Sequence, residues 1–448
     1  MKPDGTRPRA AAEAAPLGIL AGGSGVPCEI AAAVTARGRG VHIVGISGEA
    51  ERGIERFPHT WVNLGGIGAM IRAFRSSGCR ELVIIGRVRR PNLASIRPDI
   101  GFWSSLPVLL RLLRGGDDAI LRLVVDFFER QGLKVVGAHE AAPELIAPVG
   151  VLGSHTPDVS ERAAVRRCTD ALAALGPFDA AQAAVAYDGA LIAVEGADGT
   201  DAMLRRLAAP NALKRHPLAA SGASRSVLVK MPKPDQERRI DLPAIGPETI
   251  RRAAAAGLAG VAVLSGQTLF AERRLAIELA DEAGLFIIGL EAEATPRGLT
   301  ATDATDGLSG LKQCAQRTPS FAHLEDARMG ARVLAALEPI WPQAAVVVSR
   351  SYVLATEGPG GAMSAAERAG GLKPWGMRFL RRRSGVLAMT DIAGELGHDP
   401  AELVRRARAS GLAGIAILHS PRDEAALAAL RSEADRTGLF LLAPGDAR

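Results

Sequence analysis

Short apolar runs alternate with amphipathic stretches along most of the chain, and this alternation constrains the fold more than any other feature. From Leu17 onward the runs LGILA, VHIVGI, ELVIIG and LKVVGA are separated by stretches with helical spacing, such as residues 26–37 and 118–131. Strands separated by helices are typical of parallel sheets with crossover connections. The sequence therefore predicts an α/β domain over residues 16–153, preceded by a disordered tail over residues 1–15.

A second region, residues 154–294, continues the α/β pattern but begins differently. The apolar runs AAVAY and ALIAV are separated only by Asp188 and Gly189, a strong signal for a two-residue hairpin. The strands VLVKM, GVAVL and LFIIGL follow, with helical stretches between them. We expect a second α/β domain that opens with an antiparallel hairpin.

Residues 325–448 repeat this second domain in weakened form. AALGP at 173–177 recurs as AALEP at 335–339, and GLAGVAVL recurs as GLAGIAIL. Matching segments in matching order indicate a duplicated domain. Residues 295–324, which lie between the two, are rich in Thr, Gly, Ser and Asp without periodicity, which is typical of a linker.

Composition and charge narrow the classes of function. Hydrophobic residues make up 48% of the 448 residues and charged residues 23%, which is ordinary for a folded protein of several domains. The 54 basic and 48 acidic residues leave a net charge of only +6, and two Tyr and four Trp provide no interleaved aromatic platform. We expect anionic small molecules or an anionic membrane surface as partners, and no nucleic acid.

Cysteine usage and hydropathy indicate a compartment. The four cysteines are far apart and form no CxxC pair, so a reducing cytoplasm is the simplest location. No apolar stretch reaches the length of a membrane span.

The stretch KMPKPDQERRIDLPAIG at residues 230–246 carries the strongest chemical signal. Three prolines keep it out of regular secondary structure. Lys230 and Lys233 suit phosphate as point charges, and Arg238 and Arg239 suit it as planar forks. A phosphate ligand would repel Asp241 unless this carboxylate binds a metal or handles a water. The alternative is a solvated proline-rich loop.

The repeat does not keep this loop. In its place residues 388–400 read AMTDIAGELGHDP, which is shorter and has no lysine and no clear counterpart of Asp241. GTDAM at 199–203 likewise becomes GGAM at 360–363. Because the strand pattern survives while the polar residues are lost, we interpret residues 325–448 as a degenerate copy.

Several further segments occur in an order that is specific to one family. They are GILAGGSGVP at 18–27, GRVRRPNLASIRPD at 86–99, GDDAILR at 116–122, VVGAHE at 135–140 and AQAAV at 181–185. Together with the DLPAIG motif around Asp241, they resemble the LpxI family of UDP-2,3-diacylglucosamine pyrophosphatases in lipid A synthesis. The resemblance runs from about Leu17 to Glu291, and the copy lies beyond it.

The resemblance implies a fold and a reaction. The first domain would be Rossmann-like, and the second would be the catalytic domain with the DLPxIG motif and the catalytic residue Asp241. Such an enzyme uses Mg²⁺ and water to split UDP-2,3-diacylglucosamine into UMP and 2,3-diacylglucosamine 1-phosphate. Further residues at the substrate would be Gly22, Gly23, Ser24, Val88, Thr200, Asp201 and Lys230.

The glycine-rich turn departs from the family pattern. Where the family usually has three glycines, this chain has Gly22, Gly23 and Ser24. If the third position requires a positive φ angle, Ser24 strains the backbone. If the position requires only a small donor near the nucleotide, serine is tolerable.

Candidate metal ligands accompany Asp241. Mg²⁺ takes few protein carboxylates and completes its shell with water and phosphate oxygens. Glu195 and Asp201 are therefore candidates to bind Mg²⁺ together with Asp241. No histidine pair has zinc spacing, and no serine lies in a GxSxG motif, so zinc and serine hydrolases find no support.

His139 and Glu140 follow an apolar strand at its carboxyl end, where open α/β sheets bind ligands. A functional and a structural role both remain open for them. A dinucleotide fingerprint is poorly matched, because Cys28 stands at the place of the third glycine.

Two stretches combine apolar anchors with arginines, residues 102–114 and 375–383. Each could face lipid, although a core helix with snorkelling arginines explains the first and a solvated basic loop explains the second. With a lipid-linked UDP-sugar as the implied substrate, we expect a peripheral protein at the inner face of the cytoplasmic membrane.

Two rival interpretations stay open. The protein could be a non-catalytic protein that binds or senses a nucleotide-sugar lipid, although retention of Asp241 favours an enzyme. The copy could also serve as an internal dimerisation surrogate that covers a face at which two chains would otherwise pair. A homo-oligomer remains possible.

Overall fold

The computed structural model describes residues 15–88, 117–187, 189–209, 226–234, 236–291, 308–357, 361–372, 385–391, 399–419 and 424–444, with only the backbone of 117–120. The expected tail and the stretches 102–114 and 375–383 fall largely or wholly outside these residues. The described part forms two compact units. The first comprises residues up to Ile146 together with Gln236–Ala244 and Leu269–Arg273, and the second comprises the rest.

The N-terminal sheet has five parallel strands in the order β3-β2-β1-β4-β5. This is the mixed α/β fold with a parallel N-terminal sheet that the sequence predicts, so the expected fold class is confirmed. The strand order reverses between β1 and β4, which is where open α/β sheets form a ligand-binding crevice. The elements are β1 (Leu17–Ala21), α1 (Val26–Ala36), β2 (Val41–Ile46), η1 (Arg52–Arg56), β3 (His59–Val62), α2 (Ile67–Ser76), β4 (Glu81–Ile85), α5 (Asp117–Arg130), β5 (Lys134–Val135), α6 (Ala138–Ala141) and η3 (Pro143–Leu145).

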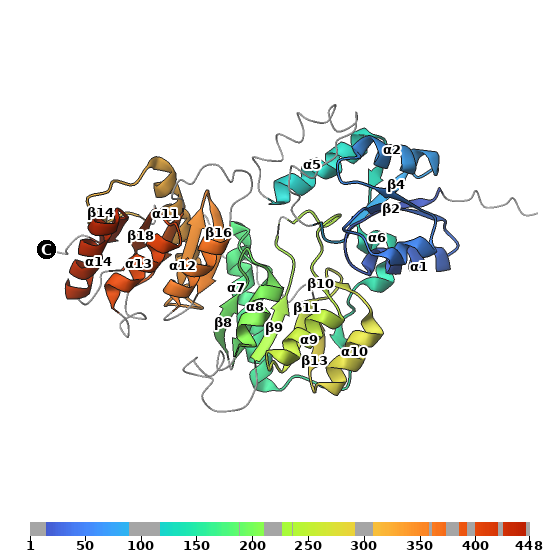
Figure 1. Ribbon diagram of the computed structural model, residues 1–448. Coiled ribbons are helices and arrows are strands. Elements are labelled where there is room, and N and C mark those ends of the chain that lie inside the picture. Colours follow the sequence, from blue (N-terminus) through green and yellow to red (C-terminus); the bar gives the residue numbers. More distant parts are fainter. Residues whose placement is uncertain are drawn as a thin grey trace, which may run out of the picture. The chain divides into compact units, whose positions relative to one another are not determined.

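Helices cover both faces of the N-terminal sheet. Figure 1 shows α2 and α5 on one side and α1 and α6 on the other. Successive residues of a strand point to opposite faces, so Ile19 joins the apolar cluster that includes α1, whereas Leu20 joins the cluster that includes α2 and α5. Burial on both faces explains why these strands read as continuous apolar runs.

The central sheet has six strands in the order β6-β13-β11-β9-β7-β8. β9, β11 and β13 are parallel, whereas β7 runs antiparallel to both β9 and β8, as the Asp-Gly signal predicts. A separate two-stranded sheet joins β10 (Ala244–Ile245) and β12 (Leu269–Phe270). The other elements are β6 (Gly150–Val151), α7 (Val159–Leu175), η4 (Gly176–Phe178), β7 (Ala183–Tyr187), β8 (Ala190–Val194), α8 (Thr200–Leu207), β9 (Ser226–Lys230), α9 (Pro247–Ala255), β11 (Gly260–Leu264), α10 (Arg273–Glu282) and β13 (Phe286–Leu290).

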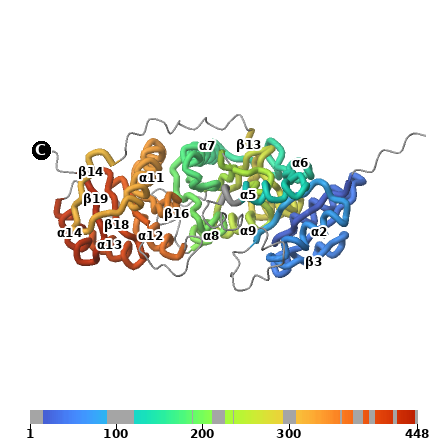
Figure 2. The backbone as a smooth tube through the Cα atoms, turned by 90° about the horizontal axis from the view of Figure 1, so that it is seen from above, coloured from blue at the N-terminus to red at the C-terminus, as the bar shows by residue number. Residues whose placement is uncertain are grey.

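The C-terminal sheet has the corresponding order, β14-β19-β18-β17-β15-β16. In Figure 2, α12, α13 and α14 lie on one side of it and α11 lies on the other. Its elements are β14 (Leu311–Gln313), α11 (Phe321–Leu337), β15 (Ala345–Ser349), β16 (Tyr352–Glu357), α12 (Ala362–Gly371), β17 (Val386–Met389), α13 (Pro400–Ala409), β18 (Gly414–Ile417), α14 (Glu424–Thr437) and β19 (Phe440–Pro444).

The two six-stranded sheets agree in detail. In each, an antiparallel hairpin carries one register irregularity, between Val185 and Ala186 in the central sheet and between Val347 and Val348 in the C-terminal sheet. The helices that precede these hairpins, α7 and α11, are each 17 residues long. The expected linker at 295–324 contains β14 and the first turn of α11. The hydrogen bonds of β14 come from β19 rather than from its neighbours in sequence.

None of the helices in the described ranges is long and apolar enough to cross a membrane.

Candidate functional site

The glycine-rich turn lies at the carboxyl end of β1, beside the end of β4. The Gly22 N–H donates to the Ile85 carbonyl at 2.9 Å, and Gly23 and Arg87 exchange two backbone hydrogen bonds of 2.7 and 2.8 Å. A Cβ at Gly22 would lie 2.5 Å from the Arg87 carbonyl oxygen, so only glycine fits there. The structure thus brings Gly22, Gly23 and the segment before Val88 together.

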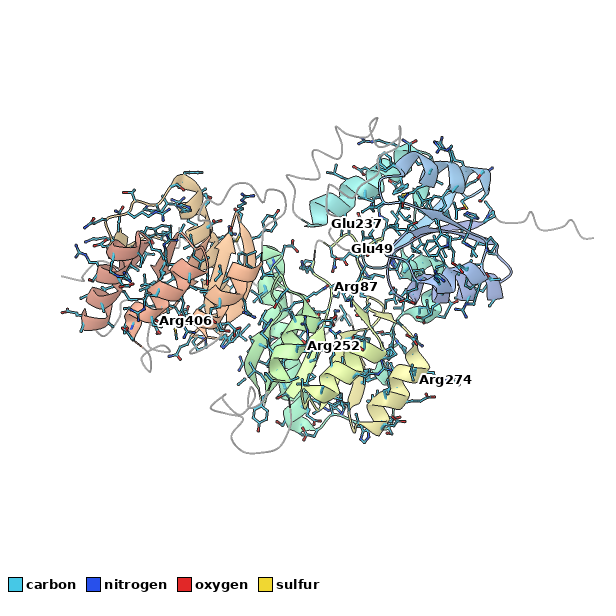
Figure 3. The ribbon with its side chains drawn as sticks, viewed as in Figure 1. Glu49, Arg87, Glu237, Arg252, Arg274 and Arg406 are labelled. Carbon is cyan, nitrogen blue, oxygen red and sulfur yellow. The ribbon has the colours of Figure 1, made fainter. Side chains whose placement is uncertain are left out.

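Ser24 completes this turn in an unusual conformation. Its φ angle is 142°, a value that side chains with a Cβ rarely adopt. The position therefore requires the positive φ angle that a glycine would supply without cost. A Cβ at the preceding Gly23 would lie 3.0 Å from the Glu49 carbonyl oxygen and 3.5 Å from that of Arg87, two residues that Figure 3 labels.

Asp241 lies in a loop that is anchored to the N-terminal sheet. Leu242 is buried in the apolar cluster that includes Ile19, and Ile240 packs against the cluster that includes Leu20. The two residues that flank Asp241 in sequence are therefore held by apolar contacts on both sides of the sheet. The half-buried carboxylate is fixed in position by these neighbours rather than by regular secondary structure.

A buried glutamine orients the Asp241 carboxylate. Gln236 is only 6% exposed, and its side-chain amide donates to Oδ2 of Asp241 at 2.5 Å. The Asp241 N–H donates to the Glu237 carbonyl at 2.9 Å, and this hydrogen bond closes a tight backbone turn between Glu237 and Asp241. Nothing in the sequence alone assigns a role to Gln236. Its place within the charged loop was visible, but its burial depends on the tertiary structure.

Arg239 is engaged within the protein. Its guanidinium donates to both oxygens of Glu237 at 2.8 Å and to Glu129 at 3.1 Å. The hydrogen bond from Arg239 holds the pKa of the Glu237 carboxyl below its usual range, against the effect of burial. Arg238, in contrast, is exposed. In this arrangement Arg239 orders the loop, and Arg238 is the better placed of the two to bind a phosphate.

His139 and Glu140 take different roles. Glu140 caps α6, because its carboxylate accepts from the Gly137 N–H at 2.9 Å. His139 has a lowered pKa: burial lowers it most, Glu140 opposes this, and the charge of Arg238 lowers it further. Glu140 thus has a structural role, and the surroundings of His139, which include the charge of Arg238 in the Asp241 loop, favour its neutral form.

The second unit contains the other predicted site residues. Glu195 is buried and accepts from the Thr200 hydroxyl at 2.9 Å and from the Gln182 N–H at 3.1 Å. Thr200 begins α8, and the next residue, Asp201, forms an ion pair of 2.8 Å with Arg252 of α9. Figure 3 labels Arg252.

The two lysines lie at and just beyond the end of β9. Lys230 is the last residue of this strand and is half-buried. Lys233 forms an ion pair with Asp179 at 2.6 Å. A phosphate that binds Lys233 has to compete with this carboxylate.

The carboxylates proposed as metal ligands fit that role unequally. Both oxygens of Glu195 accept hydrogen bonds, and Asp201 pairs with Arg252, so neither is arranged to bind a cation. Within the described residues, no group of three or more His, Cys, Asp or Glu side chains could hold a metal. Asp241 suits a Mg²⁺ that is bound mainly by phosphate oxygens and water. The ligand set of Glu195, Asp201 and Asp241 stays a prediction.

Comparison with known proteins identifies the family. The LpxI N-terminal domain matches residues 16–145, and the LpxI C-terminal domain matches residues 148–288. The UDP-2,3-diacylglucosamine pyrophosphatase LpxI of Caulobacter vibrioides is 39% identical over 281 residues, which are 62% of this chain and 99% of that protein. This chain belongs to the LpxI family. The resemblance seen in the sequence is thereby confirmed.

The family match ends where the C-terminal sheet begins. The matched residues stop at 288, within β13, whereas β14 starts at Leu311. The Caulobacter LpxI is covered almost completely by 281 aligned residues, so it has no room for a second six-stranded sheet. The C-terminal sheet is an addition of this chain to what it shares with that relative.

Proposed function

We propose that this protein hydrolyses the pyrophosphate bond of UDP-2,3-diacylglucosamine to UMP and 2,3-diacylglucosamine 1-phosphate in lipid A biosynthesis. The observation that carries the proposal is the way in which the Asp241 carboxylate is held in its loop. A carboxylate in the family's DLPxIG motif is anchored by Ile240 and Leu242 and oriented by the buried Gln236. The hydrogen bond satisfies the buried amide of Gln236 and at the same time fixes the carboxylate.

The loop chemistry suits attack of water on a phosphoanhydride. Gln236 donates to one oxygen of Asp241, which fixes the plane of the carboxylate. The carboxylate can then accept the proton of the attacking water. Arg238 is exposed and can neutralise charge on the departing phosphate, while Arg239 holds the loop through Glu237.

We further propose that the reaction requires Mg²⁺. The ion would lower the charge on the pyrophosphate and so favour attack by water. Asp241 is the described carboxylate best suited to this cation. The turn of Gly22, Gly23 and Ser24 leads into the N-terminus of α1, and this helix N-terminus would receive a phosphate or the nucleotide. The Gly22 and Gly23 N–H groups hold the turn itself, because they donate to the Ile85 and Arg87 carbonyls.

Asp241→Asn tests the catalytic role of the carboxylate. The substitution keeps the side-chain size but removes the charge, so kcat should fall by about 10²- to 10⁴-fold, and further if the metal is disturbed. Substrate affinity should largely survive, because Asp241 also repels the phosphates. Release of UMP from UDP-2,3-diacylglucosamine gives kcat, and equilibrium binding gives affinity.

Asp391→Ala is the matched control. Asp391 follows β17, the strand whose pairing with β15 matches the pairing of β9 with β7. Because the C-terminal sheet lacks the charged loop, this variant should keep nearly full turnover. Unaltered turnover in Asp241→Asn would refute the mechanism, and release of UDP in place of UMP would refute the assignment of the bond.

Because the substrate is lipid-linked, we propose that the protein works as a peripheral protein at the inner surface of the cytoplasmic membrane. The basic-aromatic stretch at residues 375–383 motivates this, and it lies outside the described residues. Anionic vesicles should bind the protein more strongly than neutral vesicles, with loss of the preference in high salt. Equal binding to both would contradict the proposal.

A further inference from the structure

The central and C-terminal sheets meet through equivalent elements. Within the second unit, α7 contacts α11, and β8 contacts β16. Each pair consists of elements that hold the same position in the two matching sheets: the 17-residue helix before the hairpin, and the outer strand of that hairpin. Contact between equivalent surfaces is the signature of a two-fold symmetric interface.

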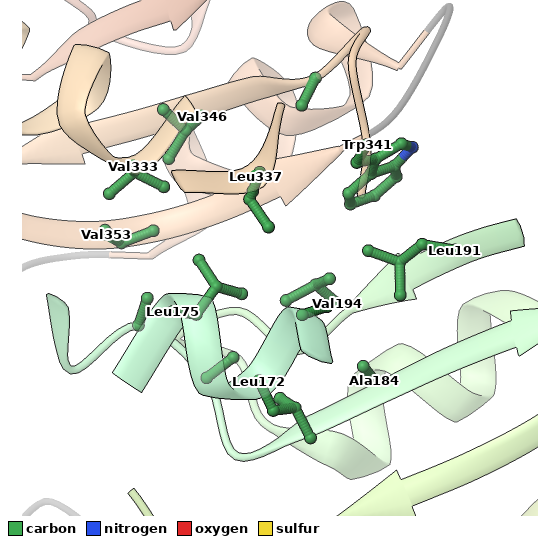
Figure 4. Packing of buried hydrophobic residues seen from close by; sticks show 14 of the residues in the cluster. Leu172, Leu175, Ala184, Leu191, Val194, Val333, Leu337, Trp341, Val346 and Val353 are labelled. Carbon is green, nitrogen blue, oxygen red and sulfur yellow. The ribbon is translucent and has the colours of Figure 1, made fainter. Parts of the chain in front are cut away.

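The contact is apolar and continuous with both cores. A single hydrophobic cluster contains residues of α7 and β8 together with residues of α11 and the segment after it. Figure 4 shows Leu337 and Trp341 of the C-terminal part facing Leu175, Val194 and Leu191 of the central part. The opposite face of the C-terminal sheet has a cluster of its own, packed against α12, α13 and α14. The shared cluster is therefore specific to the face that meets α7.

Polar contacts fix the register of this interface. The Ala197 N–H, just beyond β8, donates to the Leu354 carbonyl of β16 at 3.0 Å. A Cβ at the preceding Gly196 would lie 2.8 Å from the same oxygen, so the backbones approach as closely as glycine allows. Arg332 of α11 lies over the Phe178 ring at 5.5 Å. The central and C-terminal sheets are therefore packed against each other in a defined register and are not joined by the connecting chain alone.

Two ion pairs lie near the interface, one in each part. Arg206 of α8 pairs with Asp198 in the central part, and Arg368 of α12 pairs with Glu357 at 2.7 Å in the C-terminal part. Burial raises the pKa of Glu357 most, Arg368 and Arg206 lower it, and Asp198 raises it. The charges of the two pairs therefore lie within electrostatic range of one another.

We propose that residues 308–448 are an internal partner, derived from a copy of the central fold, that covers the α7–β8 face with its own α11–β16 face. The arrangement is that of a symmetric dimer built within one chain. The face at which two chains would pair is thus occupied by the chain itself, and the full-length protein is a monomer. This inference does not rest on the proposed activity.

The test uses the full chain with a protease site inserted between residues 296 and 306. Before cleavage, light scattering after size-exclusion chromatography should give one molecule of about 46.6 kDa. After cleavage, the two pieces should still elute together at that mass. A full-length dimer, or separation of the pieces on cleavage, would overturn the proposal.

A matched pair of variants locates the interface on α11. Leu337→Asp places a charge in the shared cluster and should let the cleaved pieces separate. Ala335→Asp on the same helix replaces an exposed side chain and should leave them together. Circular dichroism confirms that each variant is folded. Separation in both variants, or in neither, would contradict the assignment of this face.

Discussion

Ser24→Gly should stabilise the protein, although it removes a side chain. Ser24 has a φ angle of 142°, in a region that costs a residue with a Cβ about 1–3 kcal/mol. Glycine adopts such angles readily, but it adds conformational freedom to the unfolded chain, which costs about 0.5–1 kcal/mol. The expected net gain in the free energy of unfolding is therefore about 0–2.5 kcal/mol.

Ser47→Gly is the matched control for this substitution. Ser47 directly follows β2, and Ser24 lies in the turn that follows β1. The side chain of Ser47 is exposed, and the φ angle of Ser47 is negative. Only the unfolded-state cost of glycine acts there, so this variant should lose about 0.5–1 kcal/mol.

Scanning calorimetry of the full chain measures both variants, at roughly 2–4 °C of midpoint shift per kcal/mol for a domain of this size. Ser24→Gly should melt above the parent and Ser47→Gly below it. Substrate affinity should be equal or higher in Ser24→Gly, since the family's glycine-rich turn is restored. If Ser24→Gly melts as low as Ser47→Gly, the serine is not strained and the reasoning fails.

Four further predictions concern the site. Gly22→Ala should weaken substrate binding and stability together, because its Cβ would meet a carbonyl oxygen at 2.5 Å; binding and melting measurements on one preparation test this. Gln236→Leu should lower kcat by about 10- to 100-fold with little change in KM, since Asp241 loses a charge-assisted hydrogen bond. Chelation of divalent metal should stop UMP release, and added Mg²⁺ should restore it. Because the pKa of Glu237 is lowered in the folded protein, its ionised form adds stability. This stability is complete above the ordinary pKa of 4.5 and is lost as pH falls through the lowered pKa. In Glu237→Gln, the free energy of unfolding should therefore fall less steeply as the pH is lowered.

The sequence by itself determined the fold class and the family. Alternation of apolar strands and helical stretches is a local pattern, and the four strands that it predicts in the first domain are present as β1, β2, β4 and β5, whereas β3 was not predicted. The Asp-Gly signal predicted the β7–β8 hairpin for the same reason. The DLPAIG motif and its charged neighbours, read in order with the other family segments, pointed to the LpxI family, which the comparisons confirmed.

Only the tertiary structure decided how the residues of that loop divide their roles. In sequence, Arg238 and Arg239 are equivalent, yet Arg239 is paired with Glu237 and Glu129 while Arg238 is exposed. Gln236 was one polar residue among many until its burial placed the amide on Asp241. The pairing of α7 with α11 was equally invisible. The partner of each side chain depends on burial and on contacts between residues far apart in the chain. Helical and strand periodicity indicates only which face of each element is apolar.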